Sequence, residues 1–140
     1  MFKIKNLLKK RKNHIFLTTH EGEFRKLFQL TDDKIKDSLN ASNITNSIIV
    51  YKGNDTVISS PDKKIFLTEK SSSFLSTAGS GDVLSGIIGG LLSQKLKGIN
   101  AARLGCFVHS EAGLLLNEGL IASDIINKIP LILKRLNNKI

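Results

Sequence analysis

The chain has 140 residues, of which 41% are hydrophobic and 24% are charged. These values are ordinary for a soluble globular protein, and the length allows at most one domain with a modest core. The longest apolar stretch, "VLSGIIGGLL", has about half of the ~20 residues that a membrane span needs. The single cysteine, Cys106, excludes an internal disulfide. We therefore expect a cytoplasmic protein without a signal peptide or a membrane partner.

The formal net charge is +9, and much of it lies in the first fourteen residues, which contain lysine and arginine but no acid. We interpret residues 1–14 as a basic, solvated N-terminal segment. The alternative is a nucleic-acid surface, which usually interleaves basic and aromatic side chains. Because the chain has no tryptophan and a single tyrosine, Tyr51, we expect no nucleic-acid partner.

The patterns along the chain predict an α/β fold, with a central sheet and helices packed on it. Apolar and β-branched runs predict strands at 14–18, 47–53, 55–60 and 63–68, the last two forming a hairpin with a Pro-Asp turn. Helical spacing predicts helices at 22–30, 32–42, 82–92, 101–116 and 130–136. In these helices we expect Thr31 and Asn100 as N-caps, Pro130 in a first turn, and Ile35 and Leu39 on one face.

A loop of small residues, "STAGSG", leads directly into the helix predicted from residue 82. Gly79, Ser80 and Gly81 stand where the unpaired N–H groups and the dipole of a helix start attract an anion. No Gly-Lys-Ser/Thr follows, so this is not a Walker A loop. Asp82 follows instead, and beside a bound phosphate it could act as a general base. The alternative is a plain glycine-rich cap with an acid in the first turn.

Three further segments contain polar residues that suit chemistry. In "KGNDT" (52–56), Lys52 could meet a phosphate and Thr56 could donate a hydroxyl hydrogen bond, although a hairpin turn with a solvated lysine fits equally well. His20 follows the first strand, where a surface histidine without a role is the alternative. His109, in "HSEAG", has no zinc-helix spacing and is interpreted as a packed histidine.

Four motifs in this order resemble the NAD(P)H-hydrate dehydratase family, a branch of the ribokinase-like fold. They are "LTTHEGEFRKLF", "VYKGNDTVISSPDKKIFLT", "TAGSGDVLSGIIGGLLSQ" and "AARLGCFVHSEAG". The likeness runs from about residue 15 to 136 and matches the C-terminal half of the family domain, so it implies a partial ribokinase-like fold over 15–140. The Gly-Ser-Gly-Asp block is shared with small-molecule kinases, whereas the histidine signature and the hairpin narrow the likeness to the dehydratases.

The resemblance implies repair of nicotinamide cofactors: the S-form of hydrated NADH or NADPH is dehydrated at the expense of ADP or ATP. Asp82 is implied as the catalytic and substrate-contacting acid, and His20 as a second substrate contact. Magnesium is expected to arrive with the nucleotide, and no side chain is assigned as a metal ligand. The implied nucleotide-binding residues are Lys52, Gly53, Asn54, Asp55, Thr56, Gly79, Ser80 and Gly81.

The chain also departs from the family pattern. Thr19 and Glu21 replace the two prolines around the signature histidine, and Ala78 replaces a glycine before the helix start. The chain is about half as long as the family domain, so we expect an N-terminally truncated lyase whose activity the truncation could abolish. The alternatives are an inactive remnant, or a subunit that keeps a nucleotide half-site and joins a homo-oligomer or a separate N-terminal half. A ribokinase-like small-molecule kinase is a further alternative.

Overall fold

The computed structural model describes residues 6–8, 10–11, 15–68 and 71–138, so most of the basic segment lies outside the described residues. The chain divides into two compact units, Met1–Glu69 (the sheet unit) and Lys70–Ile140 (the helical unit). The predicted order of one strand, two helices, three strands and three helices is confirmed, with a short 3-10 turn η1 (Ser73–Leu75) added. None of the described helices is long and apolar enough to cross a membrane.

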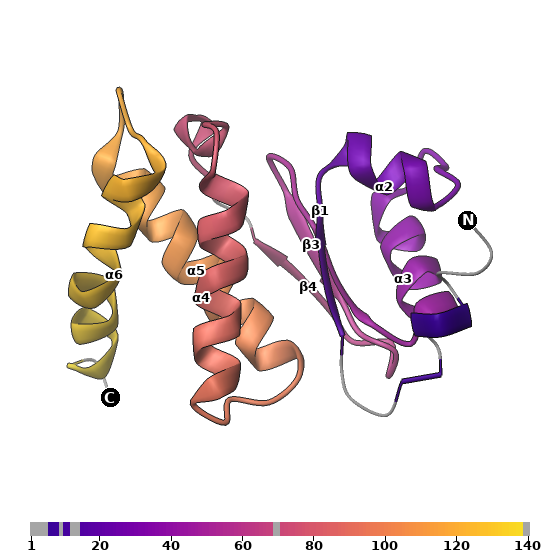
Figure 1. Cartoon of the computed structure of the whole chain (residues 1–140). Helices are drawn as coiled ribbons and strands as arrows, with labels where there is room; N and C mark the ends of the chain where they lie inside the picture. Colours follow the sequence, from indigo (N-terminus) through magenta and orange to yellow (C-terminus); the bar gives the residue numbers. More distant parts are fainter. Residues whose placement is uncertain (1–5, 9, 12–14, 69–70, 139–140) are drawn as a thin grey trace. The chain divides into compact units, whose positions relative to one another are not determined.

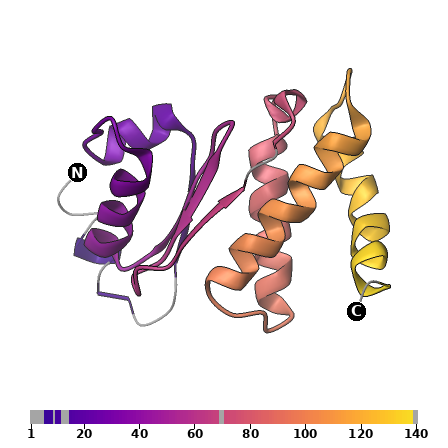
Figure 2. The ribbon, with the colours of Figure 1, turned by 180° about the vertical axis from the view of Figure 1, so that it is seen from behind.

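The sheet unit is a four-stranded mixed sheet with helices on one face (Figure 1). Strands β1 (Phe16–Thr19) and β2 (Ile48–Tyr51) pair in parallel. Helices α2 (Glu21–Leu27) and α3 (Lys34–Thr45) connect them along the chain. Strands β3 (Thr56–Ser59) and β4 (Ile65–Thr68) continue the sheet in antiparallel fashion, which confirms the predicted hairpin. Figure 2 shows the same arrangement from behind. The parallel pair needs a crossover connection, and α2 and α3 provide it.

The core of the sheet unit lies between α2, α3 and the sheet. The Phe24 ring is fully buried and stacks on Tyr51, with ring centroids 4.2 Å apart and planes 7° apart. Phe28 packs against Phe24 at 4.8 Å. Each of these rings removes a large apolar area from water, which is the main force that holds α2 on the sheet. The buried members of this cluster are Phe24, Phe28, Ala41, Ile49, Tyr51 and Val57.

Helix α3 packs through small polar residues and not through the face that Ile35 and Leu39 share. Ile35 is 38% exposed, whereas the fully buried positions of the helix are hydroxyl residues and alanine. The Ser38 hydroxyl lies 2.7 Å from that of Ser59 on β3, and Thr45 Oγ1 donates to the Ala41 carbonyl at 2.7 Å. Because these buried hydroxyls have partners, small side chains let the helix approach the sheet closely without an unpaired polar group.

The two predicted N-caps are wrong, since Gly98 precedes α5 and Asn100 lies inside that helix. Asp33 occupies the cap position of α3, and its Oδ1 accepts a hydrogen bond from Lys36 N at 3.0 Å. Thr31 instead donates through its hydroxyl to Asp37 Oδ1 at 2.8 Å and through its N–H to Oδ2 at 2.9 Å. Both threonine and aspartate are good N-caps, so residue type alone did not decide which of them begins the helix.

Thr19 is a buried position with an unmet hydrogen bond. Its Oγ1 has no partner among the described residues, although the residue is buried at the end of β1. We expect Thr19→Val to raise the free energy of unfolding by about 1 kcal/mol, since an unsatisfied buried hydroxyl is costly and valine has the same shape. Urea denaturation measures the change. Thr45→Val serves as the control and should destabilise the protein, because it removes a formed hydrogen bond. A loss of stability in Thr19→Val would contradict the assignment.

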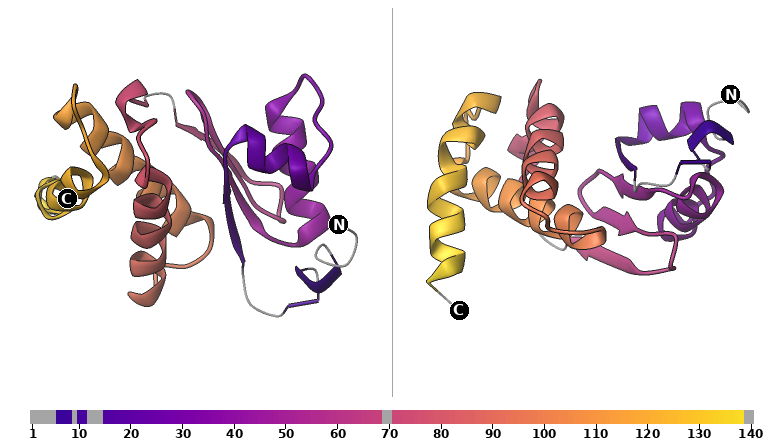
Figure 3. Two further views of the ribbon diagram at one scale, coloured as in Figure 1. Left: turned by 45° about the horizontal axis from the view of Figure 1, so that its top comes forward. Right: turned by 60° about the horizontal axis from the view of Figure 1, so that its bottom comes forward.

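The helical unit consists of α4 (Ser80–Ser93), α5 (Ile99–Leu116) and α6 (Ala122–Asn137), which lie side by side (Figure 3). Two glycines of α5 permit close contacts. A Cβ at Gly105 would lie 2.6 Å from Ile88 Cγ1, and one at Gly113 would lie 2.5 Å from Leu75 Cγ. The buried cluster of this unit comprises Val108, Ala112, Leu120, Ile125 and Ile132.

The prediction that Pro130 begins the last helix is wrong. Helix α6 already begins at Ala122, where the Asp124 carboxylate accepts a hydrogen bond from Ile121 N at 3.1 Å, and Pro130 lies in its interior. A proline there costs about 3 kcal/mol. Ile125 and Ile132, on either side of it, are both buried, and their packing against the rest of the unit offsets that cost.

Candidate active site

The start of α4 has the geometry of an anion cradle. Gly79 is the N-cap with φ of 81°, a left-handed conformation that favours glycine. Its carbonyl accepts hydrogen bonds from Asp82 N and Val83 N, each at 3.1 Å, which closes the first turn. Ser80 N donates to the Thr77 carbonyl at 3.2 Å, whereas the N–H groups of Gly79 and Gly81 have no acceptor in the described part of the chain. Those N–H groups and the helix dipole can bind a phosphate.

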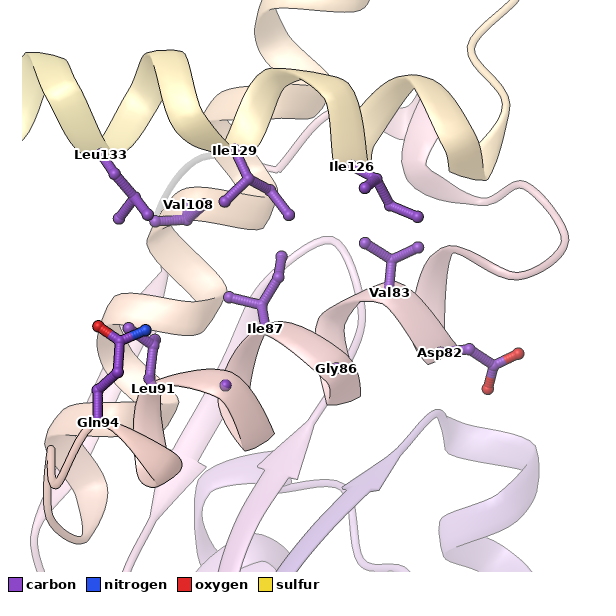
Figure 4. Close-up of a pocket in the computed structure, with 11 residues that line it drawn as sticks. Asp82, Val83, Gly86, Ile87, Leu91, Gln94, Val108, Ile126, Ile129 and Leu133 are labelled. Carbon is purple, nitrogen blue, oxygen red and sulfur yellow. The ribbon is translucent and has the colours of Figure 1, made fainter.

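Asp82 lies in the first turn of α4 with an exposed side chain. Among the residues that the structure describes, it takes part in no ion pair. Its carboxylate points away from the apolar side chains of the neighbouring pocket (Figure 4). An exposed carboxylate next to a phosphate cradle is available to accept a proton from a substrate hydroxyl.

A pocket of about 500 Å³ lies within the helical unit. Asp82 and Gln94 are the polar side chains of its lining and stand at opposite ends of it in Figure 4. Its walls are otherwise apolar or glycine, which does not suit a phosphate group but does suit an apolar or aromatic group. The lining residues are Asp82, Val83, Gly86, Ile87, Gly90, Leu91, Gln94, Val108, Ile126, Ile129 and Leu133.

His109 of α5 contacts the cradle. As predicted, it is packed, with 8% of its surface exposed. Its Nε2 lies 2.9 Å from Ser80 Oγ and 3.0 Å from the Ser80 carbonyl oxygen, and Ser80 is itself buried. Sequence reasoning missed this pairing because the two residues are 29 positions apart and no spacing rule links them.

The "KGNDT" segment forms the turn between β2 and β3, and Lys34 organises it. Lys34 Nζ donates to the Asp55 carbonyl and to Asp55 Oδ1, the latter at 3.1 Å, and lies 4.8 Å from the centre of the Tyr51 ring. A Cβ at Gly53 would lie 2.5 Å from that nitrogen, so the glycine makes room for the ammonium group. Thr56 Oγ1 donates within the turn to the Gly53 carbonyl at 3.4 Å. Lys34 was not predicted as a residue of this turn, because it begins α3 and lies 21 positions before Asp55.

The hydrogen bond from Lys34 is the largest cause that lowers the pKa of Asp55 below its ordinary value of 3.8. We expect Lys34→Met to raise the pKa of Asp55 toward that value, as measured by an NMR titration of the carboxyl carbon. Because the folded-state pKa is depressed, the pair contributes stability above the unfolded pKa and loses it as pH falls through the folded one. With Asp55 largely exposed, the energy should stay below about 1 kcal/mol. Lys36→Met is the control, and an unchanged Asp55 pKa in Lys34→Met would contradict the contact.

His20 is the N-cap of α2 and not a loose surface residue. Its ring Nδ1 accepts hydrogen bonds from Gly22 N at 3.0 Å and Glu23 N at 3.4 Å. Its backbone N–H donates to Glu23 Oε2 at 2.9 Å. A neutral ring whose Nδ1 accepts must carry its hydrogen on Nε2. That N–H lies on the exposed edge of the ring, 3.6 Å from Glu23 Oε1, and is the donor that the ring presents. The hydrogen bond from His20 N is also the largest cause that lowers the pKa of Glu23.

The glycine that follows in the histidine motif has a geometric reason. A Cβ at Gly22 would lie 3.0 Å from His20 Cε1 and 3.2 Å from Nδ1, so a larger residue would push the ring off the helix start. Glu21 occupies the first helical position, which readily accepts the proline of the family pattern.

The structure brings the predicted residues together in two groups. In the sheet unit, His20 and Lys52 each follow one of two neighbouring parallel strands, and Lys52 N donates to the Thr19 carbonyl at 2.7 Å. In the helical unit, Gly79, Ser80, Gly81 and Asp82 form a continuous helix start. No group of three or more potential metal-ligating side chains occurs among the described residues.

Comparison with known proteins identifies the family. A sequence model described as NAD(P)H-hydrate dehydratase matches residues 1–131. The chain belongs to the NAD(P)H-hydrate dehydratase family. The chain is 36% identical over 132 residues to the ADP-dependent (S)-NAD(P)H-hydrate dehydratase of Neisseria meningitidis, covering 86% of this chain and 44% of that protein. It is 32% identical to the bifunctional NAD(P)H-hydrate repair enzyme of Moorella thermoacetica, covering 90% of this chain and 26% of that protein.

A solved structure agrees with the family assignment. The ADP/ATP-dependent NAD(P)H-hydrate dehydratase of Bacillus subtilis, co-crystallised with ATP and Mg²⁺, matches with a TM-score of 0.84 and 27% identity. The match covers 90% of this chain and 49% of that one. A ribokinase-like superfamily protein of Enterococcus faecalis also matches, with a TM-score of 0.76 and 25% identity over 86% of this chain and 44% of that one. The predicted α/β, partial ribokinase-like fold is therefore confirmed, and the chain spans about half or less of these relatives.

Proposed function

We propose that this chain carries the phosphate-binding and proton-accepting part of an ADP- or ATP-dependent dehydratase for the S-form of hydrated NADH or NADPH. The observation that carries the proposal is Asp82, which is exposed, has no ion pair in the described residues, and lies three residues after the left-handed Gly79 cap in a chain of the dehydratase family. The corresponding activity belongs to the Neisseria relative by its name.

The proposed reaction has two steps, transfer of a phosphoryl group to the hydrate and elimination of phosphate from the resulting ester. The hydroxyl oxygen of the hydrate attacks the terminal phosphorus of the nucleotide, the bond from that phosphorus to its bridging oxygen breaks, and Asp82 accepts the hydroxyl proton. The phosphate ester then loses phosphate while the neighbouring ring carbon loses a proton, which restores the dihydropyridine. The N–H groups of Gly79 and Gly81 stabilise the charge on the transferring phosphoryl group, whereas the N–H of Ser80 is already bonded to the Thr77 carbonyl.

The sheet unit supplies nucleotide and substrate contacts in this proposal. The Lys52 ammonium meets a phosphate as a point charge, and the turn from Gly53 to Thr56 lines the nucleotide. His20 contacts the hydrated nicotinamide nucleotide, and its tautomer limits the neutral ring to donating a hydrogen bond through Nε2. This favours an oxygen acceptor on the substrate, such as a carboxamide or hydroxyl oxygen.

Magnesium fits the site only as an ion that the nucleotide brings. The described residues offer no cluster of three or more side-chain ligands, whereas Mg²⁺ commonly takes one or two carboxylates besides phosphate oxygens and water. Asp82 is the carboxylate at the cradle that could serve as such a ligand. Bound there, the ion would neutralise phosphate charge.

A second possibility follows from the short coverage of the relatives. The chain could be a subunit that becomes active only with a second polypeptide carrying the missing half of the domain, or with a second copy of itself. Because the chain covers 44% of the Neisseria relative and 49% of the Bacillus structure, addition of the remaining part as a separate polypeptide is the direct way to test this possibility.

The test is the dehydration of hydrated NADH by the purified chain with ADP or ATP and Mg²⁺, followed at the absorbance of restored NADH. The melting temperature is measured in parallel, since a ligand at 100 times its Kd stabilises the folded state by about 2.7 kcal/mol. We expect a rise in melting temperature with either nucleotide. Turnover by the chain alone supports an active half-domain, and turnover only after addition of the missing half supports a subunit. No shift at millimolar nucleotide would overturn the proposal.

A further inference from the structure

A buried histidine fixes the first turn of the helix that forms the cradle. His109 lies in the middle of α5, and Ser80 is the first residue of α4. Only 8% of His109 and 3% of Ser80 are exposed, and a single ring nitrogen, Nε2, lies within 3.0 Å of both the hydroxyl and the carbonyl oxygen of Ser80.

The contact with the carbonyl decides which atom carries the hydrogen. A carbonyl oxygen can only accept, so Nε2 must be the donor in its 3.0 Å contact with Ser80 O. The same N–H then lies 2.9 Å from Ser80 Oγ, which accepts as the second partner of a shared hydrogen bond. His109 therefore holds two acceptors of one residue at once.

The orientation of the Ser80 carbonyl determines the orientation of the next N–H group. The carbonyl of Ser80 and the N–H of Gly81 belong to one planar trans peptide unit and point in opposite directions. As the first residue of α4, Ser80 directs its carbonyl along the helix axis, and the Gly81 N–H therefore points out of the start of the helix. The contact with His109 holds this peptide unit in place from the side. The Gly81 N–H has no acceptor within the described residues, and it is one of the two that the proposed function assigns to the phosphoryl group.

We propose that His109 is a positioning residue of the cradle, which through the Ser80 carbonyl fixes the direction of the Gly81 N–H. This inference rests on the proposed function for its catalytic meaning, but its structural content is independent of any ligand. A preorganised donor is worth more to a developing negative charge than one that must first reorient.

The first test needs no substitution. In the full-length protein, ¹⁵N NMR of the His109 ring should show a hydrogen on Nε2. A ring with a bare Nε2 would overturn the proposal, because such a nitrogen cannot hold a carbonyl oxygen.

The second test compares two variants of equal length. In His109→Gln an amide N–H can reach the Ser80 carbonyl, whereas His109→Met fills the space without a donor. We expect the Gly81 amide resonance of the free protein to stay near its wild-type position in the glutamine variant and to move in the methionine variant. We expect ADP to bind about tenfold more weakly to the methionine variant, the loss of one hydrogen bond to a charged group, with the glutamine variant close to wild type.

The outcomes separate the two proposals. If both variants fold and both leave the Gly81 resonance unchanged, the positioning role is overturned whatever the protein binds. If the wild type binds no ADP while the Gly81 resonance moves only in His109→Met, the proposed function fails and the positioning role stands. If both variants fail to fold, the tautomer of the wild-type ring decides.

Discussion

Asp82→Asn is expected to reduce the dehydration rate of hydrated NADH by about 10²–10⁴-fold, the usual contribution of a positioned general base. Asparagine has the same shape and suits the first turn of a helix, so the cradle should keep its geometry. What is lost is the ability to accept the hydroxyl proton. The fold should lose only about 0.3–1 kcal/mol, the interaction of one negative charge with the helix dipole.

The measurement is the appearance of NADH absorbance under conditions in which the unmodified chain, with or without the missing half, turns over. Asp124→Asn is the matched control, because Asp124 is also an acid in the first turn of a helix of the same unit and caps Ile121 N. It should leave turnover unchanged. Equal rates for Asp82→Asn and wild type would remove Asp82 from the chemistry, and the phosphate contacts alone would have to account for the reaction.

Phe24→Ala is expected to lower the free energy of unfolding by about 3–5 kcal/mol, the range for truncating a fully buried aromatic ring. Phe24 is 0% exposed and stacks on Tyr51, so its loss leaves a cavity between α2 and the sheet. The consequence reaches the site, because α2 begins at the cap formed by His20. A helix of seven residues depends on tertiary packing for its stability.

Urea denaturation gives the magnitude. Leu67→Ala, on β4 of the same unit and 50% exposed, is the control and should cost about 1 kcal/mol or less. A loss below 1 kcal/mol for Phe24→Ala would mean that the ring is not the centre of the core. In that case α2, and His20 with it, would be held by other contacts.

The strands could be predicted because their signal is local. The run that forms β2 is apolar at every position, and all four residues of the strand are buried. The Pro-Asp turn marked the hairpin for the same reason. The burial of α3 could not be predicted, because its contact face consists of serine, alanine and threonine, which carry no hydropathy signal. This face of α3 is buried because it contacts β3, and that contact exists only in the folded unit.

The site divides in the same way. The glycines and Asp82 could be predicted because a loop of small residues before a helix is recognised from consecutive residues in the sequence. Lys34 and His109 were not found as site residues, since each acts on a segment 21 or 29 positions away. His20 was found as a polar residue after a strand, but its role as a cap depends on a ring geometry that Gly22 permits.

Pro130 gives α6 a property that concerns motion. Because proline has no N–H, the carbonyl of Ile126 cannot receive its helical hydrogen bond, and the ladder of α6 is interrupted at that point. We expect amide hydrogen exchange around Ile126 to be faster than around the buried Ile132, through local openings that leave the rest of the helix intact. Ile126 and Ile129 line the apolar pocket, so one wall of this pocket belongs to the part of α6 that opens most easily.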